Sequence, residues 1–413
     1  MTQIESIGIE FELVQSIDPS GEEKPSKRLQ NIHKNSQNKA NNINCAYNVQ
    51  WCPYPGFAHY FAVVGGFQRN SASIYKLSNV EYQNNNNNNN YEEQVSLVHT
   101  YVDLDEEEDF YCCCWGLAVD KSLVLSIAGY HGVIKGMNAS NLHVQYLLPG
   151  HLSEINELKI IPNNPALLLS AAKDESIRLW NTHTNVCVAM FSGRKGHRQH
   201  VLTIDVHPLS NCFVSAGHDF SVKVWSLADP LLQQIIELSG SYKKRRVPDD
   251  EHMSFPTYSQ TQPLFSTDNT TQGRLHGMTY IDCVRWYGDF VISRSSDNQV
   301  LMWAPDAQRK AGAANILREF KCPGEVCWFT KFAICPQLDL LAVGNHAGKV
   351  FIHSISGDIP GVPVEDGIVA EPTAPAGSGT IDSGEGTDVP AVVHKQQYYK
   401  AKTLPVDKIN KVN

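Results

Sequence analysis

Serine, histidine and aspartate can form a hydrolytic triad, and this chain carries them at fixed spacings more than once. The pattern is Ser, three residues, Asp, five residues, Trp, and in two copies a His lies 22 or 23 residues before the Asp. The copies are Ser170, Asp174 and Trp180 with His151; Ser215, Asp219 and Trp225 with His197; and Ser293, Asp297 and Trp303. A catalytic triad occurs once, beside an oxyanion hole. Recurrence at the same offsets predicts a structural hydrogen-bond network instead.

The spacing of the copies indicates the elements that position these side chains. The first two copies lie 45 residues apart, and each follows a Gly-His pair. That is the repeat length of a WD-type β-propeller blade, which is a four-stranded antiparallel sheet. In such a blade the Asp lies in the turn between the second and third strands, and the His lies on the entering loop. We expect His–Asp, His–Ser and Ser–Trp hydrogen bonds to connect loop, turn and strand.

Weaker copies flank the good ones and extend the predicted propeller. Each keeps an apolar strand, a small or polar turn and a second alternating strand. Counted this way, six blades are readable, and the predicted fold class is all-β, a WD40 β-propeller over residues 45–355. The units start near Tyr47, Ser96, His143, Val186, Met278 and Ile316.

The remaining segments do not read as blades. Residues 1–44 are predicted to be a polar, largely disordered lead-in, 229–276 a long insertion, and 356–413 a disordered Gly/Pro/acidic tail with a basic end. No seventh blade is recognisable in the tail. Either the alternating residues 7–17 pair with a tail strand and close the ring, or the chain is a truncated form with an open edge. The basic cluster 243–246 is either a nuclear import signal or partner patch, or a solvated loop.

Composition excludes several function classes. A formal net charge of -9 argues against bulk electrostatic binding to nucleic acid. No run of 18 apolar residues predicts a membrane span. The eleven cysteines include no C-x-x-C pair, and the consecutive Cys112, Cys113 and Cys114 would point to alternate faces of a strand. We therefore predict free, buried cysteines, no metal site, no cofactor and no enzymatic activity, since no motif for a nucleophile or nucleotide is present.

Four stretches are more specific than a generic WD repeat requires. They are Thr100–Trp115 (TYVDLDEEEDFYCCCW), Gly150–Thr184, Gly196–Leu227 and Tyr280–Trp303 (YIDCVRWYGDFVISRSSDNQVLMW). These stretches resemble the Polycomb-group family of EED, also called extra sex combs. The resemblance covers roughly residues 45–355, and the insertion before YIDCVRW is similarly placed in that family.

The resemblance implies a fold, partners and a function. The family is a seven-bladed propeller and a non-catalytic, nuclear core subunit of Polycomb repressive complex 2. Its members bind a helix of a SET-domain histone methyltransferase of the enhancer-of-zeste type on one face. On the other face an aromatic cage reads trimethylated lysine on the histone H3 tail, and this stimulates methylation and transcriptional silencing. Other subunits of that complex are implied partners; a membrane or sequence-specific nucleic acid is not.

The resemblance also implies which residues form the cage. The stretch YNVQW gives Tyr47, EDFYCCCW gives Tyr111, and CWFTKF gives Trp328 and Phe329. Tyr at 47 and Phe at 329 depart from the family's Phe and Tyr, and both keep a π face. A quaternary ammonium has no N–H to donate, so aromatic faces select it through their quadrupoles.

Two further interpretations remain open. The chain is alternatively a generic WD-repeat scaffold or a substrate adaptor, for example of a ubiquitin ligase, without methyl-lysine reading. The acidic stretch from Asp103 to Asp109 ends two residues before Tyr111. It is either a solvated loop or a surface that steers a basic histone tail towards the cage.

Overall fold

The computed structural model supports a description of most of the predicted propeller. The described residues are 10–17, 46–66, 68–83, 89–242, 255–267, 275–305, 314–322, 330–345, 349–356, 368–370 and 396–402. The predicted lead-in 18–44, the basic cluster 243–246 and most of the tail therefore lie outside the described residues.

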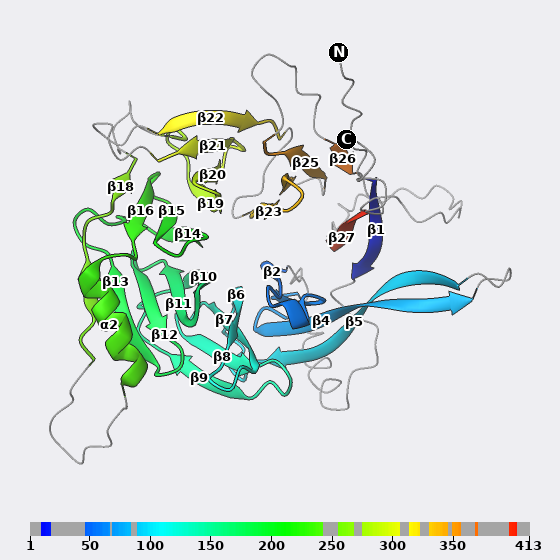
Figure 1. The fold of residues 1–413 in the computed structure, drawn as a ribbon, viewed down its shortest axis with the longest axis horizontal. Coiled ribbons are helices and arrows are strands. Elements are labelled where there is room, and N and C mark those ends of the chain that lie inside the picture. The colour runs from blue at the N-terminus through cyan, green and yellow to red at the C-terminus, as the bar shows by residue number, and fades with distance from the viewer. Residues whose placement is uncertain are drawn as a thin grey trace, which may run out of the picture.

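Six sheets follow one another around a ring, and their strands pair antiparallel except where β17 joins β13 in parallel (Figure 1). Blade 1 contains β2 (Asn48–Trp51), β3 (Tyr60–Val64), β4 (Ser71–Gln83) and β5 (Asn89–Val102), with the short 3-10 helix η1 (Pro55–Phe57) after β2. Blade 2 contains β6 (Phe110–Leu117), β7 (Leu123–Gly129), β8 (Ile134–Asn138) and β9 (Val144–Leu148). Blade 3 contains β10 (Ile155–Ile161), β11 (Asn164–Ala172), β12 (Ile177–Asn181), β13 (Val186–Phe191) and β17 (Tyr258–Gln260).

The other three sheets complete the described ring. Blade 4 contains β14 (Val201–Val206), β15 (Cys212–Gly217), β16 (Val222–Ser226) and β18 (Phe265–Ser266). Blade 5 contains β19 (Ile281–Tyr287), β20 (Phe290–Ser295), β21 (Val300–Ala304) and β22 (Asn315–Phe320). Blade 6 contains β23 (Ala333–Cys335), β24 (Leu340–Gly344), β25 (Val350–Ser354) and β26 (Ile368–Ala370). The prediction of an all-β WD propeller with six readable blades is confirmed.

The inner strands are buried on both faces because neighbouring sheets cover them. Strand β7 is buried at every position, whereas the outer strand β9 is exposed at most of its positions. Cys112 and Cys114 pack in one core cluster and Cys113 packs in another. The three consecutive cysteines are buried and free, and they point to opposite faces as the alternation of a strand requires.

The sequence repeat is offset from the sheet by one strand. The predicted units at Ser96, His143, Val186 and Ile316 start in or beside the outer strands β5, β9, β13 and β22. Each unit therefore contributes the last strand of one sheet and the first three of the next. This overlap connects neighbouring blades covalently around the ring.

The predicted insertion 229–276 contains ordered elements. Helix α2 (Pro230–Ser241) begins at the N-cap Asp229, whose carboxylate accepts hydrogen bonds from the N–H groups of Leu231 and Leu232, and Pro230 occupies the first turn. The helix packs beside blade 3, where Leu232 is fully buried in the core (Figure 1). Further along, β17 extends blade 3 and β18 supplies the fourth strand of blade 4. The segment thus fastens two adjacent blades.

The N-terminal and C-terminal strands form a two-stranded sheet of their own. β1 (Glu10–Ile17) pairs antiparallel with β27 (Gln396–Lys402), and the pair lies between blades 6 and 1 in Figure 1. That is the place where a closing blade would stand. Whether these strands complete a seventh blade, and the domain boundaries themselves, stay predictions. Among the described residues, no helix combines the length and the apolar character needed to cross a membrane.

Candidate functional site

The Ser, His, Asp and Trp side chains meet in blades 3 and 4. His151 Nδ1 lies 2.9 Å from Asp174 Oδ2, and His151 Nε2 lies 2.7 Å from Ser170 Oγ. Trp180 Nε1 donates to the same hydroxyl at 2.8 Å. In blade 4, His197 lies 3.0 Å from Asp219 and 2.7 Å from Ser215, to which Trp225 donates at 2.9 Å.

Burial makes this network structural rather than catalytic. Ser170, Ser215 and Ser293 are all 0% exposed, so no substrate reaches their hydroxyls. Burial lowers the pKa of His151. Although burial alone would raise the pKa of Asp174, hydrogen bonds from His151, Leu152 and Ser176 hold it well below its usual range. The carboxylate therefore stays ionised and accepts bonds from loop and turn.

Blade 5 contains an incomplete copy. His276 Nε2 lies 2.7 Å from Ser293 Oγ, and Trp303 Nε1 donates to that oxygen at 2.9 Å. Asp297 instead accepts a hydrogen bond from Ser295, and His276 Nδ1 has no hydrogen-bond partner within the described residues. The sequence pattern missed His276 because its Gly follows it instead of preceding it. The spacing could have revealed it: His276 lies 17 residues before Ser293, and the corresponding His lies 19 and 18 residues before the Ser in blades 3 and 4.

Tyr47 and Tyr111 form an aromatic pair at the entrance of two neighbouring inner strands. Their ring centroids are 5.3 Å apart and the rings are inclined at 75°. Tyr47 directly precedes β2, and Tyr111 is the second residue of β6. Both residues are half-buried. Two rings at nearly a right angle present two walls of a corner, which is the geometry that an aromatic cage needs.

A β-bulge orients Tyr111. The pairing of β6 with β7 shifts between Phe110 and Cys112, so Tyr111 is the extra residue. Bulges re-aim a side chain next to functional sites. The chain passes so close to Gly129 that a Cβ there would lie 1.7 Å from the carbonyl oxygen of Asp109. Only glycine permits this approach, so Gly129 is part of the device that places Tyr111.

Acidic groups surround the aromatic pair. Burial, followed by the carboxylate of Asp109 and by Tyr47, raises the pKa of Tyr111 to about 12. Tyr111 is thus a neutral phenol at physiological pH. Asp109 lies 3.6 Å from Arg69, and burial raises the pKa of that carboxyl.

The other two predicted cage residues, Trp328 and Phe329, lie outside the described residues. The chain that follows them is anchored firmly. Thr330 O accepts a hydrogen bond of 2.7 Å from Arg294, which is fully buried. Lys331 Nζ donates to the carbonyl oxygens of Leu202 and Asp282 at 2.9 and 2.8 Å. In sequence, Phe329 directly precedes this anchor point.

Comparisons with known proteins identify the family. Residues 142–181 and 185–226 match the family described as WD domain, G-beta repeat. The chain is 35% identical over 271 residues to Polycomb group protein FIE2 of Zea mays, which covers 64% of this chain and 67% of that protein. It is 36% identical over 267 residues to Polycomb protein esc of Drosophila virilis, covering 62% of this chain and 60% of that protein. The chain belongs to the Polycomb esc/FIE family.

Solved structures show the fold of this esc/FIE family member. In the crystal structure of the Chaetomium thermophilum polycomb repressive complex 2, one chain matches with a TM-score of 0.61 and 20% identity over 84% of this chain and 71% of that one. A structure of ctPRC2 in complex with H3K27me3 and H3K27M matches with a TM-score of 0.59 and 21% identity, over 75% and 66%. At this level of identity the likeness establishes the propeller fold alone.

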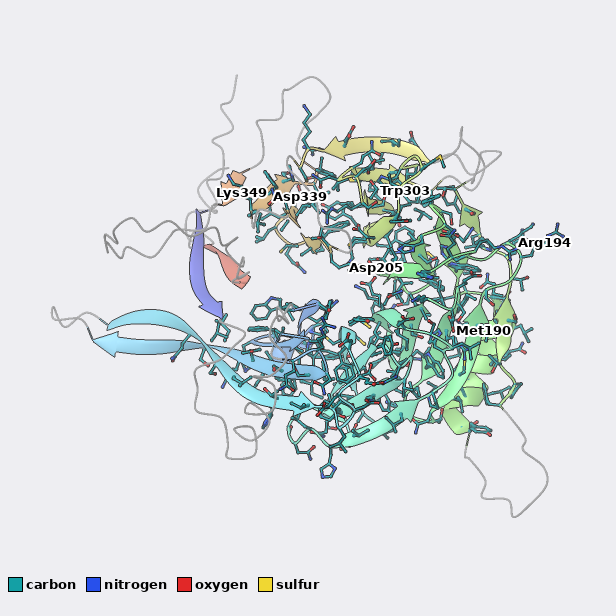
Figure 2. All side chains as sticks on the ribbon, turned by 180° about the vertical axis from the view of Figure 1, so that it is seen from behind. Met190, Arg194, Asp205, Trp303, Asp339 and Lys349 are labelled. Atoms are coloured by element: carbon teal, nitrogen blue, oxygen red, sulfur yellow. The ribbon has the colours of Figure 1, made fainter. Side chains whose placement is uncertain are left out.

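Sequence reasoning missed an ionic cluster at the centre of the ring. Glu157 of β10 is buried and lies 2.7 Å from Arg285 of β19, while Ile204 N donates to it at 2.8 Å. Burial alone would raise the pKa of Glu157, but Arg285 holds it well below its usual range. Asp205, which Figure 2 labels near the centre of the ring, pairs with Lys159 at 3.1 Å. These contacts join the inner strands of blades 3, 4 and 5.

The acidic stretch before Tyr111 is only partly exposed to solvent, so only some of its charges can attract a basic peptide. Asp103 and Glu108 turn inward to Lys135, and Asp105 lies 2.9 Å from His131. Glu106 and Glu107 remain exposed. The two alternatives drawn from the sequence thus each describe only part of the segment, because the fold buries its first and sixth residues.

Proposed function

We propose that this esc/FIE family member is a non-catalytic, nuclear subunit of a Polycomb repressive complex 2-like histone methyltransferase complex. In this role it scaffolds a SET-domain methyltransferase of the enhancer-of-zeste type. It reads trimethylated lysine on the histone H3 tail through Tyr47, Tyr111, Trp328 and Phe329, and occupation of the cage stimulates methylation and silencing.

The observation that carries the proposal is the edge-to-face pair of Tyr47 and Tyr111. These residues are 64 positions apart in the sequence, and each belongs to the start of a different inner strand. Nothing in the propeller repeat requires aromatic rings there, because the same bulge position in the other inner strands is occupied by Asn156, Leu202 and Asp282. An aromatic ring at the position of Tyr111 is thus not a requirement of the blade, and its edge-to-face contact with Tyr47 supports a binding site there.

The chemistry of the corner suits a methylated ammonium. Each well-placed ring contributes roughly 0.5–2 kcal/mol to binding a cation through its quadrupole. Unmethylated lysine is better hydrated and loses more on entering an aromatic site. The neutral phenol of Tyr111 and the nearby carboxylate of Asp109 add a favourable field for a basic peptide. The net charge of -9 agrees with a basic protein tail as the ligand.

Family membership supports the assembly role. The Drosophila and maize relatives are named as Polycomb proteins. The structural neighbours are chains of polycomb repressive complex 2, and one of those structures includes H3K27me3. Burial of the serines in the described Ser–His–Asp sets agrees with a structural role for these networks.

Peptide binding tests the reader role. Binding of trimethyl-lysine and unmodified H3 peptides is measured by calorimetry for the wild type, Tyr111→Ala and Trp328→Ala. We expect a preference for the trimethylated peptide that both variants lose while their melting transitions remain cooperative. Equal binding of the two peptides by the wild type would refute the reader role.

Affinity purification with mass spectrometry tests the scaffold role. Co-purification with a SET-domain methyltransferase supports the proposal. Recovery of a cullin-linked partner in its place contradicts it and favours the substrate-adaptor alternative.

A further inference from the structure

A buried ionic group involves the segment that leads into β6 and Tyr111. The ammonium of Lys135 in β8 contacts the carboxylate of Asp103 directly and lies 3.5 Å from Glu108 Oε2. The side chains of Lys135, Asp103 and Glu108 are 15%, 8% and 0% exposed. Two carboxylates thus share one cation in a nearly dry site. Asp103 and Glu108 lie in the segment before β6, and Lys135 lies in β8 of the same blade.

The carboxyl groups respond to this environment in opposite directions. Burial alone would raise the pKa of Asp103, but the hydrogen bonds from Lys135, Asp105 N and Tyr101 and the charge of Lys135 together outweigh it, and the pKa lies below its usual range. Burial raises the pKa of Glu108 above its usual range, even though His131 N donates to Glu108 Oε1 at 3.2 Å. Lys135 therefore neutralises chiefly Asp103 and holds Glu108 more loosely.

The ionic group is connected directly to the chain that carries Tyr111. Lys135 Nζ lies 5.4 Å from the ring centroid of Phe110, which is fully buried and directly precedes Tyr111. Asn70 Nδ2 donates to the carbonyl oxygens of Asp103 and Asp105 at 3.1 and 3.2 Å. Phe110 N donates to Arg69 O at 2.9 Å. The segment from 103 to 110 is thus held at both ends.

Stability alone does not account for this arrangement. Removing three charges from water is costly, and well-packed apolar residues often replace a buried ion pair at no loss of stability. What fixed charges supply is a defined geometry, because a displaced carboxylate would lose its contact with Lys135. A binding site of this kind requires its side chains within about 0.5 Å of the productive position.

We propose that Asp103, Glu108 and Lys135 are positioning residues that fix Tyr111 in the methyl-lysine cage. The inference rests on the proposed reader function. It assigns the inward part of the acidic segment to building the cage, and leaves the exposed Glu106 and Glu107, together with Asp109, for attracting a basic peptide.

The test compares variants within one short segment. Lys135→Met keeps the length of the side chain and removes the cation, Lys135→Arg retains it, and the double variant Glu106→Gln with Glu107→Gln removes the exposed charges. Lys223→Met is the control for loss of a buried cation elsewhere, because Lys223 is 5% exposed and donates to Ser266 at 2.9 Å in blade 4. The measured quantity is the ratio of affinities for trimethylated and unmodified H3 peptide at low and high salt.

We expect Lys135→Met to lower this ratio at least about fivefold, which is the factor for loss of one hydrogen bond. Lys135→Arg keeps the ratio within about twofold of the wild type. The Glu106 and Glu107 variant binds both peptides more weakly at low salt, by the same factor, so the ratio is unchanged. At high salt this loss of affinity disappears, because salt screens exposed charges. Lys223→Met lowers the melting temperature without changing the ratio.

The outcomes separate this inference from the proposed function. If the wild type prefers the trimethylated peptide but Lys135→Met keeps that preference, the positioning role is overturned and the reader role stands. If the wild type has no preference, the reader role itself fails. If Lys135→Met does not fold, Asp103→Asn decides by the same ratio, because it preserves the shape and removes the charge that Lys135 pairs with most closely.

Discussion

The buried networks of blades 3 and 4 and the aromatic corner of blades 1 and 2 use polar and aromatic side chains in opposite ways. The networks repeat at the same offsets, and their serines are completely buried. The corner occurs once among the described blades, and its rings are half-buried at the start of β2 and β6. Recurrence therefore separates the two regions: side chains that repeat at fixed offsets serve the blade, whereas the aromatic corner, which does not repeat in this way, is the candidate binding site.

Blade 5 lies between these extremes. It keeps the Ser–His and Ser–Trp bonds of the network, but Asp297 is diverted to Ser295. A scaffold thus tolerates the loss of one bond when the buried ring stays neutral. The corner has no such redundancy, since no neighbouring repeat among the described residues supplies a ring in place of Tyr47 or Tyr111.

The largest effect is expected from the scaffold. Trp225 is 0% exposed and packs against Phe191 and Phe213, so Trp225→Ala leaves a cavity. It also removes the indole donor from the Ser215 hydroxyl, which keeps its contact with His197. We expect the free energy of unfolding to fall by about 3–5 kcal/mol in urea titrations. Molecules that remain folded should keep their preference for trimethylated peptide. A fall below about 1 kcal/mol would contradict the structural role.

The second effect is on the pH dependence of stability, in which blade 5 should differ from the complete networks of blades 3 and 4. Burial lowers the pKa of His276 from 6.5 to about 4. The unfolded chain therefore binds a proton at His276 at higher pH than the folded chain does. The contribution of neutral, buried His276 to the free energy of unfolding is fully present above about pH 6.5 and is lost as the pH falls towards 4. The slope reaches about 1.4 kcal/mol per pH unit. Urea titrations at pH 7, 6 and 5 should show that His276→Gln reduces it.

The complete networks of blades 3 and 4 are the comparison for the pH dependence of stability that His276 produces. Asp174 and Asp219 have lowered pKa values, so their contribution is present above the ordinary carboxyl range and is lost only below it. His151 adds to the slope in both proteins, and the difference between wild type and His276→Gln isolates His276. Identical slopes in the two proteins would contradict the assignment.

A smaller change in free energy is expected from the aromatic corner, where a substitution should affect peptide binding more than stability. Tyr111→Ala should weaken binding of the trimethylated peptide by about 1–2 kcal/mol, which is the contribution of one well-placed ring. Its loss of stability should be smaller than that of Trp225→Ala because Tyr111 is only half-buried. Phe57→Ala is the matched control, since Phe57 is a 40% exposed aromatic beyond the other end of β2. Equal losses in both variants would argue against a cage.

The smallest effect is expected from Tyr47→Phe. The variant keeps the ring and restores the residue type that the family resemblance implies at this position. A quaternary ammonium donates no hydrogen bond, so we expect the affinity for trimethylated peptide to change by less than about 0.5 kcal/mol. Tyr47→Leu removes the π face and should weaken binding clearly. Calorimetry on the two variants separates the ring from the hydroxyl.

The sequence predicted the parts of the fold that depend on local chemistry. The spacing of Ser170, Asp174 and Trp180 is set by one strand, one turn and the next strand, so it is visible as a pattern. Blade 2 escaped the pattern because its partner for Ser126 is Tyr146, which lies on the fourth strand and reaches it at 2.7 Å. Gly136 makes this possible, since a Cβ there would lie 2.1 Å from the Tyr146 ring.

The site was predictable only through the family resemblance. Tyr47 and Tyr111 carry no motif of their own, and Lys135 lies 32 residues from Asp103 with nothing in the sequence to connect them. The acidic run from 103 to 109 reads as one charged surface. The fold divides it, because the turn before β6 buries Asp103 and Glu108 and exposes the residues between them.

By itself the sequence determined the repeat, the all-β class and the buried Ser–His–Asp–Trp networks, because these follow from strand alternation and turn chemistry within one blade. Only the tertiary structure decided that Tyr47 meets Tyr111, that Glu157 meets Arg285, and that Lys135 neutralises Asp103. Each of these contacts joins different blades, or a blade to the segment that precedes it. Closing the ring brings the starts of the inner strands together, and that long-range packing leaves no local pattern in the chain.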